Sequence, residues 1–135
     1  MTLEELEAFG MSLGRLAADA LPCVITLAGD LGTGKTALTR AIGRGFGVIE
    51  PVTSPTFALV HEYHTPVARR LFHLDLYRLK GPHELANLGW ESISGERALV
   101  IIEWPDRAGH LVSADALSIT LAHVGGDDSR RRVTW

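Results

Sequence analysis

The sequence predicts an α/β fold in which helices cover a mixed parallel and antiparallel sheet. A strand of the buried kind at residues 23–28 leads through glycines into a helix at 35–46, a second apolar strand runs over 98–103, and paired strand patterns indicate two hairpins. Strands that alternate with helices favour parallel pairing, whereas hairpins are antiparallel. The chain of 135 residues has the size of one ordinary domain, which we expect to span residues 1–135.

An amphipathic helix is expected first, over residues 3–20. Thr2 and Glu5 have the spacing of a capping box, and leucine or phenylalanine then recurs at helical spacing. Gly10 and Gly14 weaken this helix, but glycines on a helix also let another backbone pack closely against it.

The remaining elements follow in order along the chain. After the strand at 23–28, the second helix begins at Lys35 and ends near Phe46, because Gly47 stops it. The later elements are strands at 57–63 and 71–76, a short helix at 83–88, the strand at 98–103, and strands at 116–124 and 130–135. Short connections join the first strand pair and the last one, so each pair is predicted to form a hairpin, since a parallel crossover needs a dozen residues or more.

Composition narrows the class of protein. Hydrophobic residues make up 46% of the chain and charged residues 21%, as in soluble globular proteins. The net charge of −3 argues against nucleic-acid binding through bulk charge. The single cysteine, Cys23, cannot form an internal disulfide and is expected to be buried in its strand. No apolar stretch approaches the ~20 residues that cross a bilayer, and the first residues are acidic where a signal peptide is basic. We therefore expect a cytoplasmic protein with no membrane partner.

Residues 29–36 read Gly-Asp-Leu-Gly-Thr-Gly-Lys-Thr, which matches the phosphate-loop pattern G-x-x-x-x-G-K-[ST]. Glycines let the backbone turn so that successive N–H groups point inward at phosphate oxygens, and the following helix adds the positive end of its dipole. In this pattern Lys35 reaches the β- and γ-phosphates and the Thr36 hydroxyl binds Mg²⁺. The alternative is a chance glycine turn, but the position between a buried strand and a helix start is the context that the motif requires.

The base of the nucleotide is indicated by what the sequence lacks. Standard GTPases read guanine with an Asn-Lys-x-Asp segment, and the only asparagine here is Asn87, in Ala-Asn-Leu-Gly. The chain has no glutamine, which excludes a water-positioning glutamine of the Ras type. The expected ligand is therefore ATP with Mg²⁺.

Phosphoryl transfer needs a further oxygen ligand for the metal ion and a group that orients the attacking water. Glu103 is one candidate, because it ends an apolar strand, and ligand sites gather at the carboxyl ends of strands in α/β sheets. Asp75 is the other, on a strand whose alternation places His73, Asp75 and Tyr77 on one face. The alternatives are a strand-end carboxylate facing solvent for Glu103, and a salt bridge to Arg78 or another arginine for Asp75.

A third feature is Ser54-Pro-Thr56, which follows the phosphate-binding helix. Pro55 holds Ser54 extended, so Thr56 enters its strand from a stiff loop. Thr56 is either a sensor of the γ-phosphate, as in switch loops, or a plain strand entry.

Five segments together resemble one family. They are the phosphate loop at 29–36, Val-Thr-Ser-Pro-Thr-Phe at 52–57, His-Leu-Asp-Leu-Tyr-Arg-Leu at 73–79, Glu-Leu-x-x-Leu-Gly at 84–89 and Ile-Glu-Trp-Pro at 102–105. The chain resembles the TsaE (YjeE) family, the ATPase component of bacterial tRNA threonylcarbamoyladenosine synthesis. The resemblance implies a P-loop NTPase-like three-layer fold with a mixed sheet. It also implies partnership with the TsaD–TsaB pair, in which TsaD modifies adenosine 37 of tRNAs reading ANN codons, so that tRNA is met only indirectly.

The resemblance also implies roles for individual residues. Asp75 corresponds to the Walker-B-like acid, Glu103 to the strand-end acid near the metal ion, and Trp104 lies beside the nucleotide. Thr36, Asp75 and Glu103 are thus the expected metal site, with Asp75 and Glu103 as catalytic groups. The expected nucleotide-binding residues are Gly29, Asp30, Leu31, Gly32, Thr33, Gly34, Lys35, Thr36, Ala37, Thr56 and Trp104.

Three functions compete at this point. An accessory ATPase of tRNA modification fits every motif and the small size of the chain. A small-molecule P-loop kinase shares the phosphate loop but needs a lid and an acceptor pocket, for which little chain remains. A nucleotide-dependent binding module without turnover does not need both Asp75 and Glu103 beside the metal ion.

Overall fold

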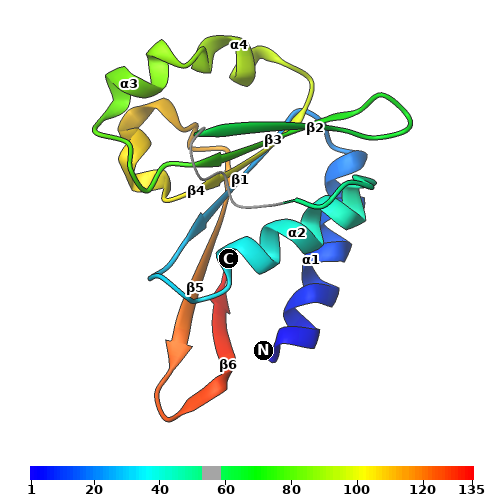
Figure 1. Ribbon diagram of the computed structural model, residues 1–135, viewed down its shortest axis with the longest axis vertical. Coiled ribbons are helices and arrows are strands. Elements are labelled where there is room, and N and C mark those ends of the chain that lie inside the picture. The colour runs from blue at the N-terminus through cyan, green and yellow to red at the C-terminus, as the bar shows by residue number, and fades with distance from the viewer. Residues whose placement is uncertain (53–58) are drawn as a thin grey trace.

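The centre of the protein is a sheet whose strands lie in the order β2-β3-β4-β1-β5-β6 (Figure 1). The computed structural model describes residues 1–52 and 59–135. The strands are β1 (Cys23–Ala28), β2 (Val60–His64), β3 (Arg70–Asp75), β4 (Leu99–Glu103), β5 (Leu117–Val124) and β6 (Asp127–Thr134). The four inner strands are parallel, and β2 and β6 add to them antiparallel at the two edges. The mixed α/β sheet predicted from the sequence is therefore confirmed.

Helices cover both faces of this sheet. The helices are α1 (Leu3–Ala18), α2 (Lys35–Phe46), α3 (Pro82–Asn87), α4 (Trp90–Gly95) and the 3₁₀ helix η1 (Pro105–Leu111). Figure 1 shows α1 and α2 together on one side of the sheet and α3 and α4 on the other. Along β4, Leu99 and Ile101 belong to the apolar cluster under α1 and α2, whereas Val100 and Ile102 belong to the cluster under α3 and α4. This alternation gives the three layers that the family resemblance implied.

The two long helices pack at very short range. A Cβ atom at Gly14 would lie 2.1 Å from the carbonyl oxygen of Ile42, and one at Gly45 would lie 2.1 Å from that of Met11. The close backbone approach predicted for the glycines of the first helix is confirmed. The capping box is present too, because Thr2 Oγ1 accepts from the Glu5 N–H at 3.2 Å and Glu5 Oε1 from the Thr2 N–H at 3.0 Å.

The face that α1 buries differs from the expected one. The helix ends at Ala18, and Leu16 is 69% exposed although it lies on the predicted apolar stripe. The buried residues of α1 are Leu6, Gly10, Gly14 and Ala17. The contact with α2 is centred on the line of glycines formed by Gly10 and Gly14, because only there can the two backbones approach closely. With this line facing α2, the larger side chain of Leu16 points outward. Cys23 is half-buried in β1, less than expected.

Both predicted hairpins are present, with shifted bounds. β2 is described from Val60, and the start predicted at residue 57 lies outside the described residues. β6 begins at Asp127, earlier than predicted, because Val124 already pairs with Asp127 and only two glycines turn the chain. The sequence did not predict α4 and η1, which are too short to show a helical period. No helix within the described ranges is long and apolar enough to span a membrane.

Candidate nucleotide site

The phosphate loop connects the carboxyl end of β1 to the first turn of α2. Gly29, Gly32 and Gly34 have φ values of 149°, 77° and 104°, which side chains with a Cβ rarely adopt. At Gly29 a Cβ atom would also lie 2.4 Å from the carbonyl oxygen of Leu121. Gly34 caps the 12-residue helix α2 without any side-chain hydrogen bond. The N–H groups of its first turn therefore receive no side-chain cap from this residue, as suits an anion site.

Lys35 lies inside this loop and is only 5% exposed. Its Nζ donates to the carbonyl oxygens of Gly29 at 2.6 Å and Asp30 at 2.8 Å, and it lies 4.4 Å from the centroid of the Trp104 ring. Burial lowers the pKa of Lys35, and the charges of Glu103, Asp75 and Asp30 oppose that shift. The ammonium group is thus a buried cation whose hydrogen-bond acceptors are uncharged carbonyl oxygens. An anionic acceptor would form a stronger hydrogen bond with it.

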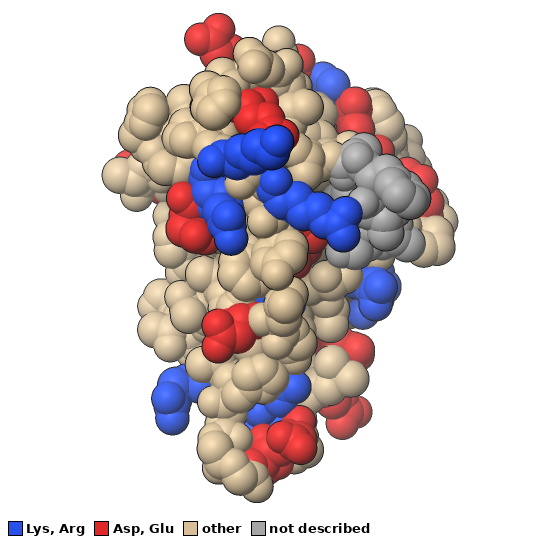
Figure 2. Space-filling model, turned by 60° about the vertical axis from the view of Figure 1, so that its left-hand side comes forward, with Lys and Arg blue, Asp and Glu red and all other residues tan. Residues whose placement is uncertain are grey.

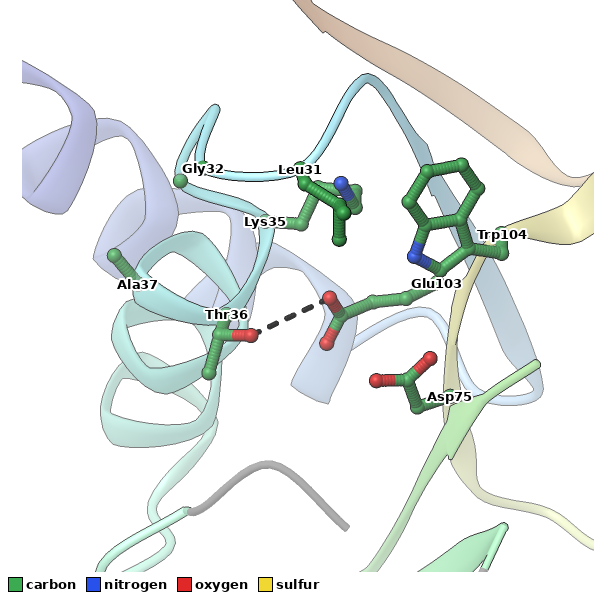
Figure 3. A pocket seen from close by; sticks show the side chains of 9 residues that line it. Leu31, Gly32, Lys35, Thr36, Ala37, Asp75, Glu103 and Trp104 are labelled. Carbon is green, nitrogen blue, oxygen red and sulfur yellow. Dashed lines mark hydrogen bonds between the residues drawn. The ribbon is translucent and has the colours of Figure 1, made fainter. Parts of the chain in front are cut away.

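Glu103 ends β4 with a carboxylate that is almost completely buried, at 2% exposure. The Thr36 hydroxyl donates to its Oε1 over 3.4 Å (Figure 3), and its Oε2 lies 2.5 Å from His73 Nε2. The alternative of a strand-end carboxylate turned to solvent is therefore wrong. Its carboxylate instead faces the start of α2, next to the hydroxyl that the motif assigns to the metal ion.

Asp75 lies directly beside Glu103, because β3 and β4 are parallel and pair these two residues. Figure 3 shows both carboxylates pointing toward Thr36. Asp75 Oδ1 accepts a hydrogen bond from the Tyr77 N–H at 3.1 Å. No ion pair joins Asp75 to an arginine within residues 1–52 and 59–135. The salt-bridge alternative thus finds no support in the described part of the chain.

Trp104 forms a wall of the site in an unusual backbone conformation, with φ 59° and ψ 55°. Its backbone N–H donates to the carbonyl oxygen of Leu27 on β1 at 3.2 Å, and the centroid of its ring lies 4.9 Å from that of the Tyr77 ring. The pocket so formed has a volume of about 310 Å³ (Figure 3). It is lined by Leu31, Gly32, Gly34, Lys35, Thr36, Ala37, Asp75, Glu103 and Trp104.

These nine lining residues were all expected from the sequence. The other expected loop residues do not line the pocket but contact the residues that do, or one another. The carbonyls of Gly29 and Asp30 accept hydrogen bonds from Lys35, and the buried Thr33 donates from its hydroxyl to Asp30 O at 2.8 Å. Thr56 lies outside the described residues, so its role remains a prediction.

Some residues at the site were not expected. Strand alternation predicts His73 on the same face as Asp75, but it does not predict the contact with Glu103. For Arg131 the sequence predicts only a strand at residues 130–135, yet its guanidinium donates to Gly32 O at 3.2 Å, and His123 Nε2 lies 3.4 Å from Leu31 O. Strand alternation was the available signal for His73, whereas no local pattern indicates that the last hairpin reaches the phosphate loop.

A glycine loop that leads from a parallel strand into a helix, beside two carboxylates at the ends of neighbouring strands, defines a P-loop NTPase-like α/β protein. Its family follows from comparison with known proteins. The family model for the threonylcarbamoyl adenosine biosynthesis protein TsaE matches residues 1–133, so the chain belongs to the TsaE family, whose members take part in tRNA threonylcarbamoyladenosine biosynthesis.

Individual relatives agree with this assignment. The TsaE protein of Nostoc sp. is 40% identical over 128 residues, covering 90% of this chain and 76% of the relative. That of Bacillus subtilis is 33% identical over 112 residues, covering 83% and 68%. The crystal structure of YdiB from the same Bacillus superposes with a TM-score of 0.74 at 30% identity, covering 98% of this chain and 78% of that one.

Proposed function

We propose that this protein binds ATP with Mg²⁺ and hydrolyses it in support of threonylcarbamoyl transfer to adenosine 37 in tRNAs reading ANN codons. It does so by acting on the TsaD–TsaB pair. The observation that carries this proposal is the convergence of Lys35, Thr36, Asp75 and Glu103 on one pocket at the phosphate loop. These four side chains match the counter-charge, the hydroxyl ligand and the acids that phosphoryl transfer uses.

The donor set fits Mg²⁺. Magnesium is usually held by one or two carboxylates together with substrate phosphates and water, and seldom by a complete protein cage. Accordingly, the described residues contain no group of three or more His, Cys, Asp or Glu side chains that could hold a metal ion. The Thr36 hydroxyl and the carboxylates of Asp75 and Glu103 would hold the ion, which neutralises phosphate charge when bound.

Other residues of the site bind the phosphates and orient the attacking water. The N–H groups of the glycine loop and of the first turn of α2 bind phosphate oxygens. Lys35 exchanges the carbonyls of Gly29 and Asp30 for the β- and γ-phosphates, which its desolvated ammonium favours. One of the two acids also orients the attacking water and accepts its proton. Trp104 and Leu31 contribute apolar side chains to the lining of the pocket beside these groups.

An accessory role is supported by the size of the site. A volume of about 310 Å³ is at the lower end for ligand pockets and leaves little room for an acceptor beside the nucleotide. Contact with tRNA through the protein pair fits the surface as well. On the face drawn in Figure 2, basic side chains lie beside acidic ones, and the net charge is −3. We therefore propose that ATP hydrolysis by this protein affects its partner proteins. In this proposal Thr56 senses whether the γ-phosphate is present.

Phosphate release and tRNA modification test the proposal together. We expect weak Mg²⁺-dependent ATP hydrolysis by the protein alone, faster hydrolysis with TsaD–TsaB, and repeated rounds of modification only when all three proteins are present. Lys35→Ala serves as the inactive control. Phosphate transfer that appears only with an added small-molecule acceptor would support the kinase instead, and repeated modification without this protein would remove the accessory role.

A further inference from the structure

The buried ring of His73 contacts the acid at the centre of the site. His73 lies in β3 with 0% exposure, two residues before Asp75 and on the same face of the sheet. Its Nε2 lies 2.5 Å from Glu103 Oε2, while the other oxygen of the carboxylate, Oε1, faces the Thr36 hydroxyl. The two carboxylate oxygens of Glu103 therefore have different partners. Oε2 contacts the His73 ring, and Oε1 faces the nucleotide site.

The roles of the two ring nitrogens of His73 follow from this contact. A carboxylate oxygen accepts hydrogen bonds, so Nε2 is the donor in this contact and Nδ1 is the ring nitrogen that needs a second partner. Among the described residues Nδ1 has no hydrogen-bond partner. A buried polar atom without a partner destabilises the fold. The stability of the core alone thus does not explain a histidine at this position, whereas its contact with Glu103 does.

A competing partner for Glu103 lies nearby. Of the carboxylates that raise the pKa of Lys35 against the effect of burial, Glu103 has the largest influence. The structure nevertheless contains no ion pair between them within residues 1–52 and 59–135, and Lys35 binds loop carbonyls instead. An ion pair between Lys35 and Glu103 would take both groups away from the nucleotide and the metal ion.

We propose that His73 is a positioning residue that fixes the Glu103 carboxylate through Oε2, so that Oε1 points at Thr36 and the metal site and Lys35 remains free for phosphate. The inference rests on the proposed ATPase function, and it adds a residue outside the phosphate loop and the acid pair. His73 itself is not among the residues that line the pocket. It acts through Glu103, as ligands of metal ligands commonly do.

The experiment compares two substitutions at this position. His73→Leu fills the space but cannot donate, whereas the side-chain amide of His73→Gln can still donate to Oε2. We expect His73→Leu to lower kcat by about 10- to 100-fold and to raise the Mg²⁺ concentration for half-saturation by a similar factor. We expect KM for ATP to change by less than about threefold, since the loop and Lys35 are intact. His73→Gln should recover most of the loss.

Two controls separate positioning from damage to the fold. Phe72→Leu changes the neighbouring buried residue, whose side chain belongs to the apolar cluster on the other face of the sheet, and it should leave kcat close to that of the parent. In the Glu103→Gln background, His73→Leu should have no further effect on residual kcat or on Mg²⁺ affinity, because the carboxylate it positions is gone. That background also removes the buried unpaired charge that could prevent the single variant from folding.

A calorimetric titration of Mg²⁺ into protein saturated with a non-hydrolysable ATP analogue gives a readout besides activity. The expected result is weaker Mg²⁺ binding in His73→Leu and nearly parental binding in His73→Gln. Unchanged Mg²⁺ affinity in folded His73→Leu would overturn the inference, as would an equal effect in the Glu103→Gln background. If the parent protein hydrolyses no ATP, the proposed function fails, and this titration still decides the role of His73.

Discussion

Glu103→Gln is the sharpest single test of the site, because the substitution keeps the size of a side chain that is 2% exposed and changes its charge. The amide oxygen can still accept from His73, which lies 2.5 Å away, and only the strength of that hydrogen bond falls. Hydrogen bonds to charged groups contribute about 1.5–3 kcal/mol and neutral ones about 0.5–1.5 kcal/mol. The neutral amide also avoids the desolvation cost of a buried charge, which opposes this loss. We therefore expect the free energy of unfolding to change by less than about 1 kcal/mol.

The effect on hydrolysis should be much larger. An amide neither accepts a proton nor binds a divalent cation well, and losing one such preorganised group costs about 10²–10³ in rate, or about 2.7–4 kcal/mol. The assay is Mg²⁺-dependent phosphate release, with urea unfolding of the same samples as the stability measurement. Glu62→Gln is the matched control, since Glu62 pairs with Arg70 at the exposed edge of the sheet. Parental turnover by folded Glu103→Gln would refute the assignment of this acid.

Three further substitutions test other parts of the structure. Lys35→Ala should abolish productive use of ATP, with a loss of at least ~10² in phosphate release, and unchanged activity in folded protein would disprove the loop assignment. Asp75→Asn should lose hydrolysis as Glu103→Gln does; a modest loss of stability alone would instead favour a structural role. Gly14→Ala should lower the unfolding midpoint in urea, because a Cβ would lie 2.1 Å from the Ile42 oxygen. Overpacking costs about 1–3 kcal/mol, against about 1 kcal/mol gained in helix propensity. Gly125→Ala is its control, because nothing lies within 4 Å of that position, and an equal shift in both would contradict the packing argument.

Local patterns in the sequence were sufficient for much of this fold and site. The period of two along residues 71–76 placed His73 and Asp75 on one face, and the apolar run that ends at Glu103 placed that acid at a strand end. The glycine spacing located the loop together with Lys35. Each of these inferences depends on residues that are close in sequence, where backbone geometry leaves few choices.

Features that depend on distant contacts could not be predicted. Leu16 is exposed because Gly10 and Gly14 are the residues of α1 that face α2. The periodicity of apolar residues contains no information about how closely two helix backbones approach. Arg131 reaches the carbonyl of Gly32, 99 residues away in sequence, only because β5 and β6 continue the sheet beyond β1. The contact between His73 and Glu103 needed the register of β3 against β4, which no local pattern specifies.

The position of the acids is a consequence of that register. Leu99 and Ile101 face the cluster under α1 and α2, so the period of two turns Glu103 to the same face, where α2 presents Thr36. A shift of one residue in β4 would send the carboxylate to the opposite face, among the apolar residues under α3 and α4, where burial without a partner is very costly. The left-handed conformation of Trp104 then ends the strand and places its ring over Lys35. The same alternation that builds the two apolar layers thus selects which side of the sheet can bind a nucleotide.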